Sequence, residues 1–135
     1  PVISSYTISS QKPLSVQLKL PLEIDPKATD SSYEINIIFE QSPEVIWDVY
    51  FYVGELSQKP DSDDALLASF PTKKLGGTRV KLTSNISIPI TLKELTQLQQ
   101  EHGKITIFVK TSLSLENKQL IFQEITFQQV NDEHP

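Results

Sequence analysis

Apolar and polar residues alternate in several separate stretches of this chain, and this two-residue period is the feature that most limits its fold. In "LSVQLKL", residues 14–20, every second side chain is leucine or valine and those between are polar. Successive side chains of a β-strand point to opposite faces of a sheet, so this pattern predicts a strand with one buried face. The same pattern, or a short apolar run, occurs in residues 33–40, 45–53, 65–70, 79–90, 104–113 and 119–129. In the last two stretches, the positions expected to point inward are Ile105, Ile107, Val109, Ile121, Ile125 and Phe127.

One segment has helical rather than strand spacing. Leucines recur at positions 92, 95 and 98; Thr91 precedes them as a helix N-cap, with Glu94 three residues further on. This arrangement predicts a capping box at the start of a short amphipathic helix, and Gly103 is expected to end it. About seven strands and one helix predict a mainly β fold, a single antiparallel β-sandwich domain over residues 1–135 with flexible ends at 1–11 and 130–135.

The composition argues against several classes of partner. The formal net charge is −5, the basic residues are scattered, and Arg79 is the only arginine, so we expect no nucleic-acid binding. No apolar run approaches the roughly 20 residues that a membrane-spanning helix needs. Cysteine is absent, which excludes disulfides and thiolate metal sites and leaves the cellular compartment undetermined. A chain that starts at Pro1 and contains no methionine is expected to be a piece of a longer protein.

Few residues offer catalytic or metal-binding chemistry. The two histidines, His102 and His134, have no metal-ligand partner at a suitable spacing, and no serine has a histidine near it in sequence. The acidic stretch Asp61–Asp64 could offer oxygen ligands to calcium, but it lacks the EF-hand spacing and is more typical of a solvated turn. We therefore expect no catalytic group, no cofactor and no tight copper or zinc site in this chain.

The stretch "VIWDVYFYV", residues 45–53, places an aspartate among apolar and aromatic residues. Alternation puts Asp48 opposite the face of Trp47 and beside Tyr50 and Tyr52. Because a carboxylate is costly to bury without partners, we expect Asp48 to be a structural anchor that accepts hydrogen bonds. The two tyrosines either form an exposed aromatic row, as in a binding module, or lie beneath a second packed layer or the helix.

Several of these stretches, in this order, resemble the C-terminal domain of plant-type tyrosinases and polyphenol oxidases, dicopper enzymes that oxidise phenols. The resemblance covers about residues 12–129 and includes an apolar strand leading into a helix start at 90–95 and two closing strands. It departs from the family where Ile46 and Trp47 replace a lysine and a phenylalanine, and where Thr72 replaces a histidine. Its most specific residues are Trp47, Asp48, Val49 and Tyr50 in one stretch and Ser69 and Phe70, after an acidic loop, in another.

The resemblance implies a jelly-roll-like sandwich that covers the active-site entrance of a tyrosinase-like catalytic domain on the same polypeptide. The two copper ions would belong to that catalytic domain, because two histidines cannot ligate both. The chain itself would be a regulatory, non-catalytic domain. We expect Leu75 or Leu115, as apolar tips of polar loops, to enter the phenol pocket. The alternative is a free-standing binding sandwich, for instance a carbohydrate-binding one, because this architecture has many functions.

Overall fold

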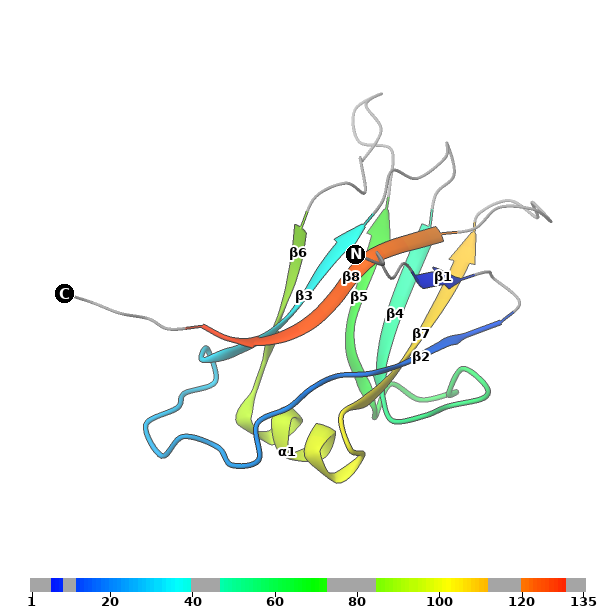
Figure 1. The fold of residues 1–135 in the computed structure, drawn as a ribbon. Coiled ribbons are helices and arrows are strands. Elements are labelled where there is room, and N and C mark those ends of the chain that lie inside the picture. Colours follow the sequence, from blue (N-terminus) through cyan, green and yellow to red (C-terminus); the bar gives the residue numbers. More distant parts are fainter. Residues whose placement is uncertain (1–5, 9–11, 40–46, 73–84, 112–119, 131–135) are drawn as a thin grey trace.

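The computed structural model describes residues 6–8, 12–39, 47–72, 85–111 and 120–130, which contain eight β-strands and one α-helix (Figure 1). The mainly β fold expected from the sequence is confirmed. The strands are β1 (Tyr6–Ile8), β2 (Leu14–Gln17), β3 (Tyr33–Phe39), β4 (Trp47–Val53), β5 (Leu66–Thr72), β6 (Asn85–Ile90), β7 (Lys104–Thr111) and β8 (Leu120–Gln129), and helix α1 (Leu92–Gln100) lies between β6 and β7.

The strands form two four-stranded antiparallel sheets, ordered β1-β8-β3-β6 and β2-β7-β4-β5. The pairing is nested: β1 pairs with β8, β2 with β7, β3 with β6 and β4 with β5, as in a long hairpin rolled around one core. Strand β3 also pairs with β8, and β4 with β7, and these pairs join the strands into two sheets of four. Eight strands connected in this way make a jelly-roll sandwich, the architecture that the sequence led us to expect.

The core lies between the two sheets and follows the predicted alternation on most strands. Ile105, Ile107 and Val109 of β7 all point inward, as predicted. On β8 the prediction is wrong at one position: Phe122 is fully buried, whereas Ile121 is only half-buried. The reason is a β-bulge opposite Ile38, at which the pairing shifts by one residue and reverses the alternation along β8.

Helix α1 crosses one end of the sandwich (Figure 1), and the predicted capping box is present. The Thr91 hydroxyl accepts a hydrogen bond from the Glu94 amide at 3.0 Å, and the Glu94 carboxylate accepts one from the Thr91 amide at 3.0 Å. Gly103 ends the helical turn with a φ of +77°. A side chain at Gly103 would collide with the Leu18 carbonyl, so this position requires glycine for two reasons.

Two strand boundaries differ from the expectation. Strand β1 was not predicted; it lies within the segment 1–11 expected to be flexible, and it is too short for alternation to reveal it. Strand β2 ends at Gln17 rather than at Leu20. The amide of Leu18 still donates a hydrogen bond to the Gly103 carbonyl at 2.8 Å, but the partner strand β7 begins only at Lys104, after the turn at Gly103. The chain thus leaves the sheet where it meets the end of the helix.

Candidate functional site

The two stretches that carry the most specific residues of the resemblance lie side by side on β4 and β5. Val49 pairs with Phe70 and Tyr50 pairs with Ser69 in the antiparallel register. Val49 is fully buried in the core, and Ser69 is exposed on the outer face. The side chains of Trp47 and Phe70 lie outside the described part of the structure. Segments separated by about twenty residues in the sequence therefore form one continuous patch of sheet.

Asp48 is half-buried on the outer face of β4. Its neighbours across the sheet are Pro71 on β5 and Lys110 on β7, so the only side chain directly opposite it that carries a charge has the opposite sign. Opposite charges at facing positions of an antiparallel pair attract each other. No described side chain donates a hydrogen bond to the Asp48 carboxylate. Its role as a hydrogen-bonded anchor stays a prediction.

Three aromatic side chains lie together on the outer face of this sheet. Tyr52 and Phe108 make an edge-to-face contact with ring centroids 5.5 Å apart, and Tyr50 is the neighbour of Phe108 across the sheet. Tyr52 is fully buried, while Tyr50 and Phe108 are half-buried. The ammonium group of Lys59 sits 3.9 Å from the centre of the Tyr50 ring, close enough for a cation–π interaction. The tyrosines do not form an exposed row.

The tyrosines are covered by the segment between β4 and β5, residues 54–65, which we call the cover segment. Lys59 of this segment lies over the Tyr50 ring, and Asp63 is close enough to Tyr52 for its charge to act on the phenol. Thr106, a fully buried residue on β7, holds the start of the cover segment. Its hydroxyl donates a hydrogen bond to the Gly54 carbonyl at 2.6 Å and accepts one from the Leu56 amide at 2.9 Å. The far end is held by a bond of 2.8 Å from the Val53 amide to the Ala65 carbonyl.

The Tyr52 hydroxyl is enclosed beneath the cover segment, and no described residue forms a hydrogen bond with it. Burial raises the pKa of this phenol above its ordinary value, and the negative charge of Asp63, together with Tyr50, raises it further. Burial disfavours the charged phenolate, so Tyr52 stays neutral and protonated at physiological pH. A buried hydroxyl without a hydrogen-bond partner lowers the free energy of unfolding. The hydroxyl of Tyr52 therefore does not help to hold the cover segment on the sheet.

Polar candidates from the sequence are dispersed. His102 is exposed and adopts a φ of +58° in the turn after α1, and His134 lies outside the described residues. Asp61, Asp63 and Asp64 are exposed, as expected for a solvated turn. In the described part of the chain, no three histidine or acidic side chains are grouped so that they could hold a metal ion. Nor does this part contain a helix long and apolar enough to cross a membrane.

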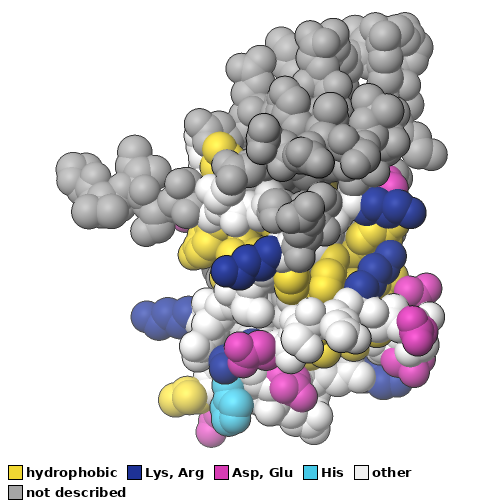
Figure 2. Space-filling model, turned by 90° about the vertical axis from the view of Figure 1, so that its right-hand side faces the viewer, with side chains coloured by type: hydrophobic (Ala, Val, Ile, Leu, Met, Phe, Trp, Pro, Cys, Tyr) yellow, Lys and Arg dark blue, Asp and Glu magenta, His cyan; other side chains and the backbone are white. Residues whose placement is uncertain are grey.

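The surface charges are mixed. Figure 2, which looks at the side that faces right in Figure 1, shows lysine and acidic side chains interspersed around exposed hydrophobic ones. One ion pair on the described surface joins Lys104 of β7 to Glu55 of the cover segment at 3.0 Å, with both side chains substantially exposed. An exposed pair of this kind contributes little to stability. This ion pair is one of the contacts between the cover segment and the sheet.

The two leucines expected to enter a phenol pocket, Leu75 and Leu115, lie outside the described residues. The strands that lead into their segments are described: Trp47 at the start of β4 pairs with both Thr72, the last residue of β5, and Thr111, the last residue of β7. Strands β5 and β7 therefore both end at the side of the sandwich opposite α1 (Figure 1). The sequence did not single out Leu22, whose side chain is 99% exposed.

Comparison with models of protein families, with curated proteins and with solved structures gives no match for this chain.

Proposed function

We propose that this chain is a regulatory domain that shields the active-site entrance of a tyrosinase-like copper enzyme. The observation that supports the proposal best is the register of β4 and β5. The two stretches that most resemble the polyphenol oxidase family, Trp47–Tyr50 and Ala68–Phe70, are direct neighbours in one sheet of a jelly-roll sandwich. Residues that resemble a family at separate places in the sequence support a common fold more strongly when they also pack together.

The domain would act by contact, not by chemistry of its own. The described residues provide no group that could hold copper, so both copper ions would be bound by the catalytic domain. A covering domain on the same polypeptide has an effective concentration on the order of millimolar, which makes even a weak contact sufficient to block substrate. A rigid sandwich suits this task because it loses little conformational entropy when it docks.

The free-standing binding module has less support. That function would use exposed aromatic side chains, and the best candidates were Tyr50 and Tyr52. Tyr52 is fully buried, and Lys59 lies over the ring of Tyr50. A sugar or another flat ligand would first have to displace Lys59, so the face as folded is not arranged to receive one.

The rate of phenol oxidation tests the proposal. The full-length protein, with its catalytic domain, is compared with a version from which residues 1–135 have been removed by proteolysis at the preceding linker. We expect the truncated enzyme to oxidise small phenols faster at every substrate concentration, because its entrance is open. Equal rates would contradict shielding and would favour a separate binding role.

A further inference from the structure

Among the described strands, four lie at the edges of the two sheets: β1 and β6 in one sheet, β2 and β5 in the other. An edge strand has unpaired amides and carbonyls on one side, and a strand of another molecule can pair with them. Strands β1 and β2 have three and four residues, which is too short to hold such a partner. Strands β5 and β6 have seven and six residues, so they are the edges of the described fold that another strand could use.

Strand β6 has the composition of a strand that associates readily. It contains three isoleucines and no charged residue in the sequence NISIPI, and isoleucine favours β-structure. Its register with β3 is continuous over all six residues, whereas a shift interrupts the pairing of β5 with β4. Ser87 and Pro89 are exposed, and β6 lies at the outer side of its sheet, next to β3 (Figure 1). This edge is therefore accessible, regular and rich in residues that favour strand pairing.

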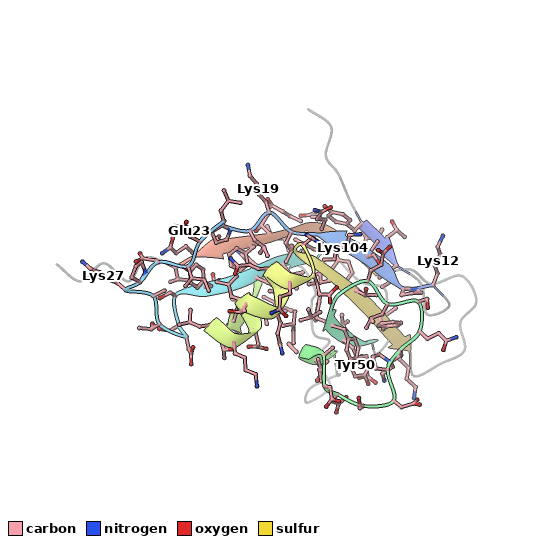
Figure 3. All side chains as sticks on the ribbon, turned by 90° about the horizontal axis from the view of Figure 1, so that it is seen from below. Lys12, Lys19, Glu23, Lys27, Tyr50 and Lys104 are labelled. Carbon is pink, nitrogen blue, oxygen red and sulfur yellow. The ribbon has the colours of Figure 1, made fainter. Side chains whose placement is uncertain are left out.

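Charge does not protect the β6 edge. Many edge strands carry lysine or other charged residues, which keep a second strand away. Glu34, opposite Pro89 on β3, accepts a hydrogen bond from Gln128 of β8, on the side away from the edge. The charged side chains labelled in Figure 3 belong to β7 and to the segments before and after β2: Lys12, Lys19, Glu23, Lys27 and Lys104.

Proline is the one feature of β6 that opposes pairing. The two long edge strands each contain a proline, Pro71 in β5 and Pro89 in β6, and none of the four interior strands contains one. Proline has no amide hydrogen to donate to a neighbouring strand. Because Pro89 pairs with Glu34 in an unbroken register, its nitrogen is on the side that faces away from β3. The missing donor is therefore missing from the free edge.

We propose that Pro89 blocks an edge-to-edge dimer of this domain, in which β6 of one copy would pair antiparallel with β6 of a second copy. A second copy is the partner that fits this edge, because an uncharged strand placed against itself across a two-fold axis meets no like charge. The same symmetry removes two donors from the new ladder, one for each copy of Pro89. The proposal concerns self-association and does not depend on the shielding function.

Pro89→Val tests the proposal, because it restores the amide on a residue that favours strands. Sedimentation equilibrium of this chain, from low micromolar to nearly millimolar concentration, measures the association. The unsubstituted chain should stay monomeric. Pro89→Val should strengthen dimerisation on the order of tenfold, since each copy regains one hydrogen bond. Pro89→Ala restores the same amide with a small side chain and should also dimerise, which provides a second variant if valine impairs folding.

The matched control is Ser87→Val, which adds the same apolar side chain on the same exposed face of β6 but adds no amide. It should remain monomeric, and circular dichroism should show that every variant is folded. Dimerisation of the Pro89 variants and not of Ser87→Val supports the proposal. Folded Pro89 variants that stay monomeric at the highest concentration would overturn it. Equal dimerisation of Ser87→Val would overturn it as well, because apolar surface and not the missing amide would then control association.

Discussion

The outer faces of the two sheets have the same alternating sequence pattern but lie in different environments. On β3 and β8 the outward side chains are mostly polar and partly or fully exposed, among them Glu34, Thr126 and Gln128. On β4 and β7 the outward Tyr52 and Thr106 are completely buried beneath the cover segment. The difference teaches that alternation identifies which residues face outward from the core, but not whether the outer face remains in water.

The covered face also differs in how it is stabilised. Thr106 joins β7 to the cover segment through two hydrogen bonds of its hydroxyl, and Tyr52 fills the space between with its ring. On the other face, a pair such as Gln128 with Glu34 lies on the surface, where solvent competes for the same groups. Substitutions should therefore lower the free energy of unfolding on the covered face of β4 and β7, and they should hardly change it on the exposed face of β3 and β8.

The largest difference should follow from Tyr52→Ala. Removing a fully buried aromatic ring leaves a cavity under the cover segment and should lower the free energy of unfolding by about 3–5 kcal/mol. Gln128→Ala, on the exposed face, should change it by no more than about 0.5 kcal/mol. Urea unfolding of the two variants measures both. Equal midpoints would mean that the cover segment does not enclose the ring in solution.

Thr106→Val should have the next largest effect. Valine has nearly the same shape but loses the hydroxyl's hydrogen bonds with Gly54 and Leu56 and its 3.5 Å contact with the Ser15 hydroxyl. The Leu56 amide is left without its partner, so we expect the free energy of unfolding to fall by about 1–3 kcal/mol. The same substitution on the other face, Thr126→Val, is the matched control and should be close to neutral. If the two substitutions lower the free energy of unfolding equally, the hydroxyl of Thr106 does not hold the cover segment.

Tyr52→Phe should have a smaller effect, and of the opposite sign. It removes a buried hydroxyl that forms no hydrogen bond with any residue the structure describes, so stability at neutral pH should be unchanged or rise by up to about 1 kcal/mol. The pKa of Tyr52 is raised in the folded state, so the folded protein holds this proton more tightly than the unfolded chain does. Its contribution to stability is complete below the pKa of the unfolded chain, near 10, and is lost as the pH rises through the folded value.

The alkaline part of the stability profile should therefore be less steep in Tyr52→Phe than in the unsubstituted protein. Unfolding by urea between pH 9 and pH 11, followed by circular dichroism, provides the comparison. Identical slopes in the two proteins would indicate that the phenol of Tyr52 is in contact with water in the folded state.

Lys59→Ala should give the smallest change. Loss of a cation–π contact at a largely exposed site should cost about 0.5 kcal/mol. It should also increase the exposure of the Tyr50 ring, which ultraviolet difference spectroscopy detects. A cost of several kcal/mol would show that Lys59 is a principal anchor of the cover segment, contrary to the role we give to Thr106.

Features that depend on neighbours in the sequence could be predicted, and those that depend on distant residues could not. The capping box of Thr91 and Glu94 is local, as is the alternation along β7, and both were predicted correctly. The β-bulge that turns Phe122 inward depends on how β8 pairs with β3, about eighty residues earlier. Likewise the cover segment has the composition of a solvated loop, and its position over Tyr52 depends on Thr106, about fifty residues further on.

The exposure of Leu22 follows the same rule. Leu22 continues the spacing of Leu18 and Leu20, so the sequence gives no sign that it is exposed while Leu18 is buried and Leu20 packs against the core. The preceding Pro21 carbonyl accepts a hydrogen bond from the Gln99 side chain, a contact between residues far apart in the sequence. The expectation for Leu75 and Leu115 used the polar character of their loops alone, and it stays a prediction.

The central claim is that residues 54–65 cover the outer face of β4 and β7, and that this covered aromatic face is structural. Amide hydrogen exchange of the unsubstituted chain and of Thr106→Val, followed by mass spectrometry, tests it most directly. We predict that peptides containing Leu56, whose amide donates a hydrogen bond to the Thr106 hydroxyl, exchange slowly in the unsubstituted chain and faster in Thr106→Val. Fast exchange of these peptides in both proteins would contradict the claim, because the cover segment would then not be held on the sheet in solution.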